Sequence, residues 1–192
     1  MIRNIWKWAL RIGAVAIALV LALVLYLAVL HGTGNFHTVI AGELYRSAQL
    51  DPDQIEAQHT AHGFASILNL RGAQPGKDWY DAEIATSARL GITHADFRMS
   101  ARQELEPDRV QELIALMRRL PKPLLVHCQG GSDRSGLASA LYLAAIKGRP
   151  LDEAGGQISL VYGHFSLPRL SEAYPMDVTW QLVAPSLGSA AP

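Results

Sequence analysis

The longest apolar run in the chain lies near its N-terminus and predicts a membrane-spanning helix. Ile12 to Leu30 holds 19 residues without a charged or strongly polar side chain. At a rise of about 1.5 Å per residue, a helix of this length spans about 28 Å, close to the thickness of a hydrocarbon core. Arg3, Lys7 and Arg11 precede the run. By the positive-inside rule they place the N-terminus in the cytoplasm and the rest of the chain on the far side.

A cleaved signal peptide and a buried core helix are the alternative interpretations of this run. A signal peptide shares the order of positive charge and apolar stretch, but its apolar core is usually about 7–15 residues long and a small-x-small cleavage site follows. Only Gly32-Thr33-Gly34 resembles such a site. A core helix would show a polar face. We therefore expect residues 1–34 to form an uncleaved membrane anchor and linker.

Beyond the linker, short β-type runs alternate with helical patterns. The pattern predicts strands over 36–40, 64–70, 92–99 and 124–127, helices over 52–62, 78–90, 137–146 and 151–161, and one more helix beginning at Pro107. Strands separated by helices indicate an α/β fold, with a central, mostly parallel sheet flanked by helices on both faces. We expect this domain to occupy residues 35–184 and a small-residue-rich, disordered tail to occupy 185–192.

Composition and charge narrow the functional classes. A chain of 192 residues with 49% hydrophobic content fits one domain with an appendage. The 17 basic and 17 acidic residues balance, so nothing indicates a nucleic-acid partner. The only cysteine, Cys128, excludes an internal disulfide. Because a zinc site needs more cysteines and a spaced histidine, we expect no metal and no cofactor.

That cysteine lies in the stretch that carries the chemistry. The apolar run ends at His127-Cys128. The five residues Gln129-Gly130-Gly131-Ser132-Asp133 follow, and Arg134-Ser135-Gly136 then opens a strongly apolar helical stretch. This is the pattern of a strand, a tight loop and a helix N-terminus. The backbone N–H groups of such a loop can turn inward and hold a dianion. Gly130 and Gly131 are expected to relieve the strain of the curl.

The side chains at this spacing suit covalent phosphoryl transfer. A thiol attacks as thiolate, which a helix N-terminus and a nearby guanidinium both favour. The planar fork of Arg134 can bind two phosphate oxygens. The hydroxyl of Ser135 can donate a hydrogen bond to the sulfur. A phosphate in this loop would have its phosphorus in front of the Cys128 sulfur.

The motif His-Cys-x5-Arg-Ser resembles the P-loop of the cysteine-dependent protein tyrosine and dual-specificity phosphatases. Leu44-Tyr45-Arg46-Ser47-Ala48-Gln49 and Asn69-Leu70-Arg71 are similar to stretches of the atypical dual-specificity phosphatases of bacteria, plants and fungi, so the resemblance covers most of residues 36–165. It implies a protein tyrosine phosphatase-like fold. The resemblance leaves open a role for Arg71 beyond a strand-end charge, but for Arg71 itself we expect a solvated surface position.

The resemblance also implies roles for the loop residues. Cys128 would form a phosphocysteine, Arg134 would bind substrate and transition state, and Ser135 would assist the departing thiolate. His127 would orient the loop by hydrogen bonding. The phosphate would lie among Gln129, Gly130, Gly131, Ser132, Asp133, Arg134 and Ser135.

Other families that use a cysteine loop or a phosphate loop fit less well. Rhodanese-like sulfurtransferases usually place four residues between Cys and Arg, whereas this loop has five. Low-molecular-weight tyrosine phosphatases carry the motif near the N-terminus. A Walker-type nucleotide loop needs Gly-Lys-Ser/Thr, which this stretch does not contain.

Two carboxylates are candidates for the general acid that protonates the leaving oxygen. Asp133 is the first, because some bacterial phosphatases carry a similar Asp-Arg-Thr/Ser-Gly loop in which the Asp assists proton transfer. A carboxylate beside a phosphate dianion is repelled unless it carries a proton, and a protonated carboxyl is what an acid catalyst needs. Asp96 is the second. It precedes Cys128 by 32 residues, which suits the family, but the pattern places it inside a strand.

These observations predict a membrane-anchored, metal-independent phosphatase for phosphate monoesters. By resemblance the substrates are phosphotyrosine and possibly phosphoserine or phosphothreonine on proteins. Phosphoinositides or phosphorylated small molecules are the alternative, although the loop has no Lys of the kind found in phosphoinositide phosphatases. A catalytically weak, phosphate-binding scaffold is the non-enzymatic alternative. The predicted topology makes the catalytic domain extracytoplasmic, and periplasmic in a Gram-negative bacterium.

Overall fold

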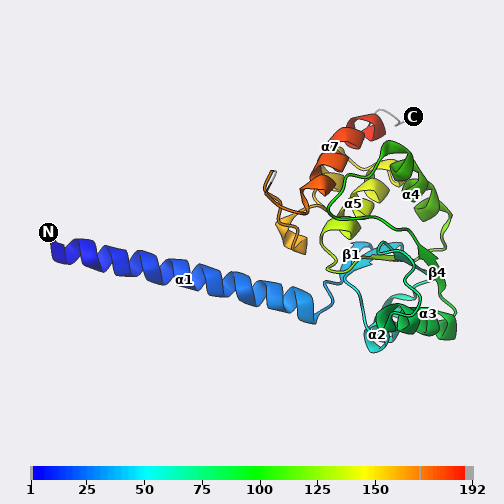
Figure 1. The fold of residues 1–192 in the computed structure, drawn as a ribbon, viewed down its shortest axis with the longest axis horizontal. Coiled ribbons are helices and arrows are strands. Elements are labelled where there is room, and N and C mark those ends of the chain that lie inside the picture. Colours follow the sequence, from blue (N-terminus) through cyan, green and yellow to red (C-terminus); the bar gives the residue numbers. More distant parts are fainter. Residues whose placement is uncertain (1, 169, 189–192) are drawn as a thin grey trace.

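A long, apolar helix projects from an α/β domain (Figure 1). The structure, a computed structural model, describes residues 2–168 and 170–188. The projecting helix is α1 (Ile2–Gly32). Its segment Leu10–Leu30 is long and apolar enough to cross a membrane, and none of it is buried against the domain. A signal sequence near an N-terminus has the same properties, so the helix is a candidate span by length and composition.

The domain is built on a five-stranded sheet. The strands are β1 (His37–Ile40), β2 (Leu44–Ser47), β3 (Ser66–Asn69), β4 (Thr93–Asp96) and β5 (Leu124–His127), in the spatial order β1-β2-β5-β3-β4. β1 pairs antiparallel with β2, and all other pairs are parallel. The predicted mostly parallel sheet is thus confirmed. β5 lies at its centre, fully buried.

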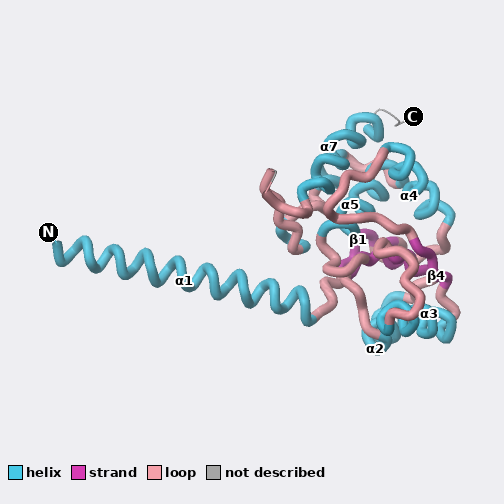
Figure 2. The backbone as a smooth tube through the Cα atoms, viewed as in Figure 1, coloured by secondary structure: helices cyan, strands magenta, loops and turns pink. Residues whose placement is uncertain are grey.

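Helices cover both faces of the sheet (Figures 1 and 2). On one side lie α2 (Pro52–His62) and α3 (Asp78–Leu90). On the other lie α4 (Pro107–Arg119), α5 (Asp133–Leu141) with its π-helical continuation η1 (Tyr142–Ile146), and α7 (Tyr174–Gly188). The short α6 (Leu151–Gly155) and the 3₁₀ turn η2 (Leu160–Tyr162) connect them. The predicted α/β architecture is confirmed.

Local sequence signals explain where several of these helices begin and end. Asp51 caps α2 by accepting a hydrogen bond from the Gln54 N–H, and the Gln54 side chain accepts from the Asp51 N–H in return. Gly63 and Gly91 end α2 and α3 in the left-handed conformation. The apolar stripe of α4, which is Val110, Leu113, Ile114 and Met117, is buried as predicted.

Three sequence predictions for the C-terminal half are wrong. The expected helix over 151–161 ends at Gly155, because Gly155 and Gly156 follow each other and favour a turn. The helix expected over 137–146 begins earlier, at Asp133. The disordered tail was expected to begin at Pro185, but α7 continues through Pro185 to Gly188. Residues 189–192 lie outside the described ranges.

Candidate active site

The predicted loop forms where the central strand ends. β5 leads into Cys128, and α5 begins five residues later at Asp133. The Cys128 side chain is buried, and its sulfur accepts a hydrogen bond from the Gly131 N–H at 3.3 Å. The Ser135 hydroxyl lies 3.6 Å from the same sulfur. Both contacts place a polar hydrogen beside the sulfur or within reach of it, in the position from which a donor would assist a thiolate nucleophile.

The loop is held in place by hydrogen bonds that its carbonyl groups accept from neighbouring elements. Four consecutive carbonyls accept hydrogen bonds: Gln129 from the Gln49 N–H at 3.2 Å, Gly130 from Asn35 Nδ2 at 2.9 Å, and Gly131 and Ser132 from Arg46 Nη2 at 2.9 Å each. The C=O and N–H of a trans peptide point in opposite directions. The N–H groups of residues 130–133 therefore point away from these partners, and that of Gly131 bonds the Cys128 sulfur, an arrangement suited to an anion-binding nest.

Arg46, in β2, is the buried support of this loop. Besides the two loop carbonyls it donates to the Gln157 carbonyl at 2.6 Å, and its guanidinium packs on the Tyr162 ring at 4.1 Å. Burial lowers the pKa of Arg46 to about 10, a shift that Cys128 and other nearby groups oppose. The side chain therefore stays charged at neutral pH. The resemblance in residues 44–49 singles out this stretch of the sequence. It does not predict that the Arg46 guanidinium supports the carbonyl groups of the loop.

One of the two loop glycines is required by the backbone. Gly131 has a φ of +73°, and a Cβ there would lie 2.5 Å from the Ala48 nitrogen. A Cβ on Gly130 would meet only the Ser132 hydroxyl, at 3.9 Å. The expectation that both glycines relieve strain is therefore right for Gly131 and wrong for Gly130.

A positively charged cleft of about 810 Å³ opens in front of the loop. Its lining residues are Arg71, Gln74, Arg98, Met99, Ser100, Ala101, Arg102, Gln103, Cys128, Gln129, Gly130, Asp133 and Arg134. Four of them are arginines, and Asp133 is the single carboxylate. Arg134 donates to the Met99 carbonyl at 3.4 Å, while its buried Nε has no partner. The cleft thus offers unused donors to an anion.

The predicted phosphate-binding residues are divided between two sides of the loop. Gln129, Gly130, Asp133 and Arg134 line the cleft. Ser132 lies instead beside a crevice of about 180 Å³ that it shares with Asn35 and the end of α1. Ser135 and Gly131 approach the Cys128 sulfur.

Arg71 does not occupy the solvated position expected for it. Its guanidinium packs 3.5 Å above the Trp79 ring, donates to Gln49 Oε1 at 3.1 Å, and lines the cleft. Burial and the positive charge of Arg134 lower the pKa of Arg71. Two guanidinium groups that repel each other in one cleft gain stabilisation from a bound dianion.

The two candidate acids occupy different environments. Asp133 lines the cleft, and its Oδ1 lies 2.7 Å from Nδ1 of the buried His164. Asp96 ends the edge strand β4, where its oxygens accept hydrogen bonds from Asn69 Nδ2 at 2.8 Å and from the Tyr80 hydroxyl at 2.6 Å. Asp96 does not line the cleft. The structure therefore brings Asp133, and not Asp96, together with Cys128 and Arg134.

His164 bridges two carboxylates, Asp133 and Asp177. Its Nε2 lies 2.9 Å from Asp177 Oδ2 in α7, opposite the contact with Asp133. Burial of His164 opposes its protonation, but the hydrogen bonds to Asp133 and Asp177 prevail and raise its pKa. The two carboxylates thus favour the protonated form of the imidazole beside the cleft. No local sequence motif predicts that His164 pairs with Asp133 and Asp177.

A second buried network orients the strand end. Glu83 in α3 accepts hydrogen bonds from His127 Nε2 at 3.1 Å, His94 Nε2 at 2.8 Å and Gln49 Nε2 at 2.6 Å. Burial opposes ionisation of Glu83, yet the charge and hydrogen bond of His127, with the other two donors, hold the pKa of Glu83 well below its usual range. His127 thus has the anchoring partner that its expected orienting role requires.

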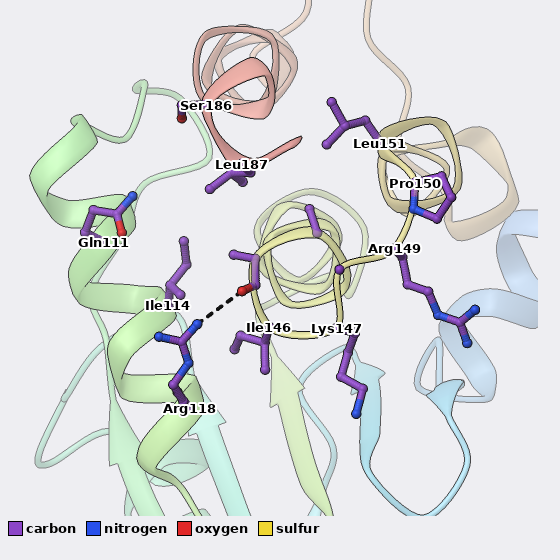
Figure 3. Close-up of a pocket in the computed structure, with 13 residues that line it drawn as sticks. Gln111, Ile114, Arg118, Ile146, Lys147, Arg149, Pro150, Leu151, Ser186 and Leu187 are labelled. Atoms are coloured by element: carbon purple, nitrogen blue, oxygen red, sulfur yellow. Dashed lines mark hydrogen bonds between the residues drawn. The ribbon is translucent and has the colours of Figure 1, made fainter. Parts of the chain in front are cut away.

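A second cavity lies elsewhere, between α4, η1 and α7 (Figure 3). It measures about 940 Å³ and sits near the C-terminal end of α5, away from the loop at which that helix begins. Its lining contains Arg118, Lys147 and Arg149 but no cysteine, histidine or carboxylate. Within the described ranges, no cluster of three or more His, Cys, Asp or Glu side chains could hold a metal ion.

Comparison with known proteins agrees with this geometry. A family model described as the tyrosine phosphatase family matches residues 30–150, which is more than half of the chain. The sequence matches no curated protein.

Solved phosphatase structures share the fold at low sequence identity. TpbA from P. aeruginosa is 16% identical with a TM-score of 0.62, over 81% of this chain and 89% of that one. A putative phosphatase from Shewanella putrefaciens CN-32 is 18% identical with a TM-score of 0.57, over 83% and 95%. The catalytic core of SIW14 from S. cerevisiae is 18% identical with a TM-score of 0.57, over 79% and 92%.

Proposed function

The chain belongs to the tyrosine phosphatase family, and from that membership we propose that it is a membrane-anchored cysteine phosphatase that hydrolyses phosphate monoesters through a phosphocysteine. The observation that carries the proposal is the inward-facing row of N–H groups from residues 130–133 beside the Cys128 sulfur, with the unpaired Arg134 Nε at the same cleft. A phosphate dianion bound there would satisfy the free donors.

The first chemical step transfers the phosphoryl group to sulfur. The Cys128 thiolate attacks phosphorus, an S–P bond forms, and the P–O bond to the substrate breaks. Arg134 and the loop N–H groups stabilise the charge on the equatorial oxygens. Asp133 gives its proton to the leaving oxygen and becomes a carboxylate, which the His164 ring stabilises across the 2.7 Å contact.

The second step returns the enzyme to its starting state. Asp133 takes a proton from a water molecule, which attacks phosphorus and breaks the S–P bond. Inorganic phosphate forms and the sulfur leaves as thiolate. The Ser135 hydroxyl, 3.6 Å from the sulfur, donates a hydrogen bond to it and eases its departure.

Phosphotyrosine is the first substrate to test, followed by phosphoserine and phosphothreonine. A TpbA structure with phosphotyrosine is among the similar solved structures, at 16% identity. The experiment is metal-free turnover of an aryl phosphate by the full chain in detergent micelles, with and without vanadate. Cys128→Ser should abolish turnover, by at least about 10³-fold. Ser139→Ala, a substitution of a buried hydroxyl without a partner in the same helix, is the matched control. Vanadate-insensitive turnover, or activity that survives Cys128→Ser, would contradict the proposal.

A polyphosphorylated small molecule or headgroup is a second candidate substrate, favoured by the number of arginines. One phosphate monoester needs Arg134, and the cleft holds Arg71, Arg98 and Arg102 as well. SIW14, similar in fold, is described as a PP-IP phosphatase. If the additional arginines bind further phosphates, Arg102→Gln should lower kcat/KM for an inositol polyphosphate more than for a phosphotyrosine peptide. Equal losses would favour the monoester.

We also propose that α1 stays attached as the anchor, with the catalytic domain on the extracytoplasmic side. The exposed apolar segment Leu10–Leu30 and the preceding Arg3, Lys7 and Arg11 support this orientation. Protease added to spheroplasts of a bacterial host that makes the full chain should digest the domain and leave a membrane-bound fragment. Protection until the membrane is broken would reverse the orientation.

A further inference from the structure

Five large apolar side chains are exposed on one short segment of the domain. Leu160, Val161, Phe165, Leu167 and Leu170, here called the apolar patch, are between 45% and 82% exposed. Outside α1, Leu182 is the only other large apolar side chain among the described residues with comparable exposure. Soluble domains rarely gather apolar side chains in this way unless something covers them.

The apolar patch lies on the side of the domain from which α1 departs. The segment that carries it, orange in Figure 1, reaches toward that side. The contact is direct, because the Tyr26 hydroxyl of α1 donates to the Val161 carbonyl at 2.5 Å. A Cβ built on Gly163 would lie 3.3 Å from Leu30 Cδ1. The end of the candidate span and the base of the patch therefore touch.

This contact fixes the depth of the apolar patch relative to a bilayer. Tyr26 lies four residues before Leu30, the end of the candidate span. At about 1.5 Å per residue, the Val161 carbonyl that it binds lies about 6 Å inside the boundary set by Leu30. Interfacial apolar segments are buried by about 5–10 Å. The patch thus lies at the depth where exposed Leu, Val and Phe side chains are stabilised by lipid.

The backbone of the turn at residues 159–164, which carries the first part of the segment, is also suited to this environment. The turn bonds internally: the Tyr162 N–H donates to the Ser159 carbonyl at 3.0 Å, Gly163 to Leu160 at 2.9 Å, and His164 to Ser159 at 3.1 Å. The Val161 carbonyl is taken by Tyr26. These polar groups would not be left unsatisfied at the lipid surface, where an unpaired backbone group is costly.

We propose that the apolar patch inserts into the surface layer of the bilayer that α1 spans, as a second membrane contact of the catalytic domain. The inference rests on the proposed anchor. The same segment reaches the active site, since His164 bonds Asp133 and a Cβ on Gly163 would meet the Ser132 hydroxyl at 3.1 Å. Two membrane contacts would hold the cleft beside the bilayer, facing phosphates carried at its surface.

The test is fluorescence quenching of the full chain in phosphatidylcholine vesicles. In a Cys128→Ser background, Phe165→Cys, Leu19→Cys and Leu182→Cys each carry one environment-sensitive probe. Lipids brominated near the headgroup end of their acyl chains should remove about half of the fluorescence at position 165, and lipids brominated deeper should quench the probe at 19. Leu182, equally apolar but on α7, is the matched control and should not be quenched. Thermal unfolding like that of Cys128→Ser alone shows that each labelled chain is folded.

The outcomes separate the claims. A quenched probe at 165 beside an unquenched one at 182 supports the proposal. An unquenched probe at 165 with a quenched one at 19 overturns it while the anchor stands, and leaves a protein partner as the occupant. Two unquenched probes overturn the anchor and the docking surface together. Because turnover of a soluble aryl phosphate is measured separately with Cys128 intact, a failed phosphatase assay does not alter the quenching result.

Discussion

Two cavities of this domain are similar in volume and both are lined by cations, yet only one of them contains the cysteine and unsatisfied hydrogen-bond donors. In the cavity between α4, η1 and α7, of about 940 Å³, the cations already have partners. Lys147 pairs with Glu43 at 2.9 Å, Arg149 lies 3.8 Å from Glu153, and Arg118 donates to the Ala145 carbonyl at 3.1 Å (Figure 3).

In the cleft at the end of β5, of about 810 Å³, Arg102 also has a partner, Glu172 at 2.7 Å, but the loop around Cys128 leaves donors unsatisfied. The carbonyls of this loop are bonded on the far side, its N–H groups turn toward Cys128, and the buried Arg134 Nε has no partner. A site for an anion is made by donors that the fold leaves unsatisfied and holds in place, and not by cavity size or positive charge alone. Matched substitutions, one in the cleft and one outside it, test this difference.

The largest effect is expected for the arginine at the centre of the cleft. Arg134→Lys keeps the positive charge but loses the planar fork that contacts two phosphate oxygens, so kcat for an aryl phosphate should fall by about 10²–10³-fold. Arg118→Lys, in the other cavity, should leave kcat unchanged. The measurement is steady-state hydrolysis by the full chain in detergent. Equal losses for the two variants would mean that the cavities do not differ as described.

The next prediction concerns the proton that the leaving oxygen receives, which in our proposal comes from Asp133 in the cleft. Asp133→Asn removes the acid, so hydrolysis of phenyl phosphate should slow by about 10²-fold. Hydrolysis of nitrophenyl phosphate, whose leaving group needs no proton, should slow far less. Asp96→Asn should affect neither substrate, because Asp96 bonds Tyr80 and Asn69 outside the cleft. A loss at Asp133 that is the same for both leaving groups would indicate a structural role instead.

A smaller effect is expected where the backbone forms the nest. Gly131→Ala places a Cβ 2.5 Å from the Ala48 nitrogen at a positive φ, so the free energy of unfolding should fall by about 1–3 kcal/mol. Gly130→Ala, next to it, should cost less than about 1 kcal/mol, because its Cβ has room. Urea unfolding of both variants compares them. Equal costs would contradict the structural distinction between the two glycines.

The sequence predicts local features of this molecule well and distant pairings poorly. The strand, loop and helix around Cys128 follow from adjacent residues, as do the cap at Asp51 and the apolar stripe of α4. The partners of Glu83 and His164 lie 44 and 31 residues away in sequence, at His127 and Asp133. Nothing local shows that such polar side chains are buried, since their pairing depends on how α3, α7 and the loop pack.

The sequence also cannot distinguish adjacent residues that the fold treats differently. Gly130 and Gly131 are equivalent in the motif, and only the approach of Ala48 separates them. Arg71 could equally have faced solvent after β3. Its place in the cleft depends on Trp79, which comes from the next helix. The identity of the nucleophile is therefore local information, whereas the charge around it is a property of the folded domain.

The smallest effect, a dependence of stability on pH, also separates the two cavities. The folded-state pKa of His164 is raised above its ordinary value by Asp133 and Asp177. Protonation of His164 therefore stabilises the fold, and this contribution is fully present below the pKa that His164 has in the unfolded chain. The contribution is lost as pH rises through the raised pKa of His164 in the folded protein. His164→Gln should lower Tm more at about pH 6 than at about pH 9. Lys147→Gln, which breaks the ion pair with Glu43 and involves no histidine, should lower Tm by the same amount at both values. A flat difference for His164→Gln would show that the imidazole is neutral in the folded protein, and would leave Asp133 without a charged neighbour.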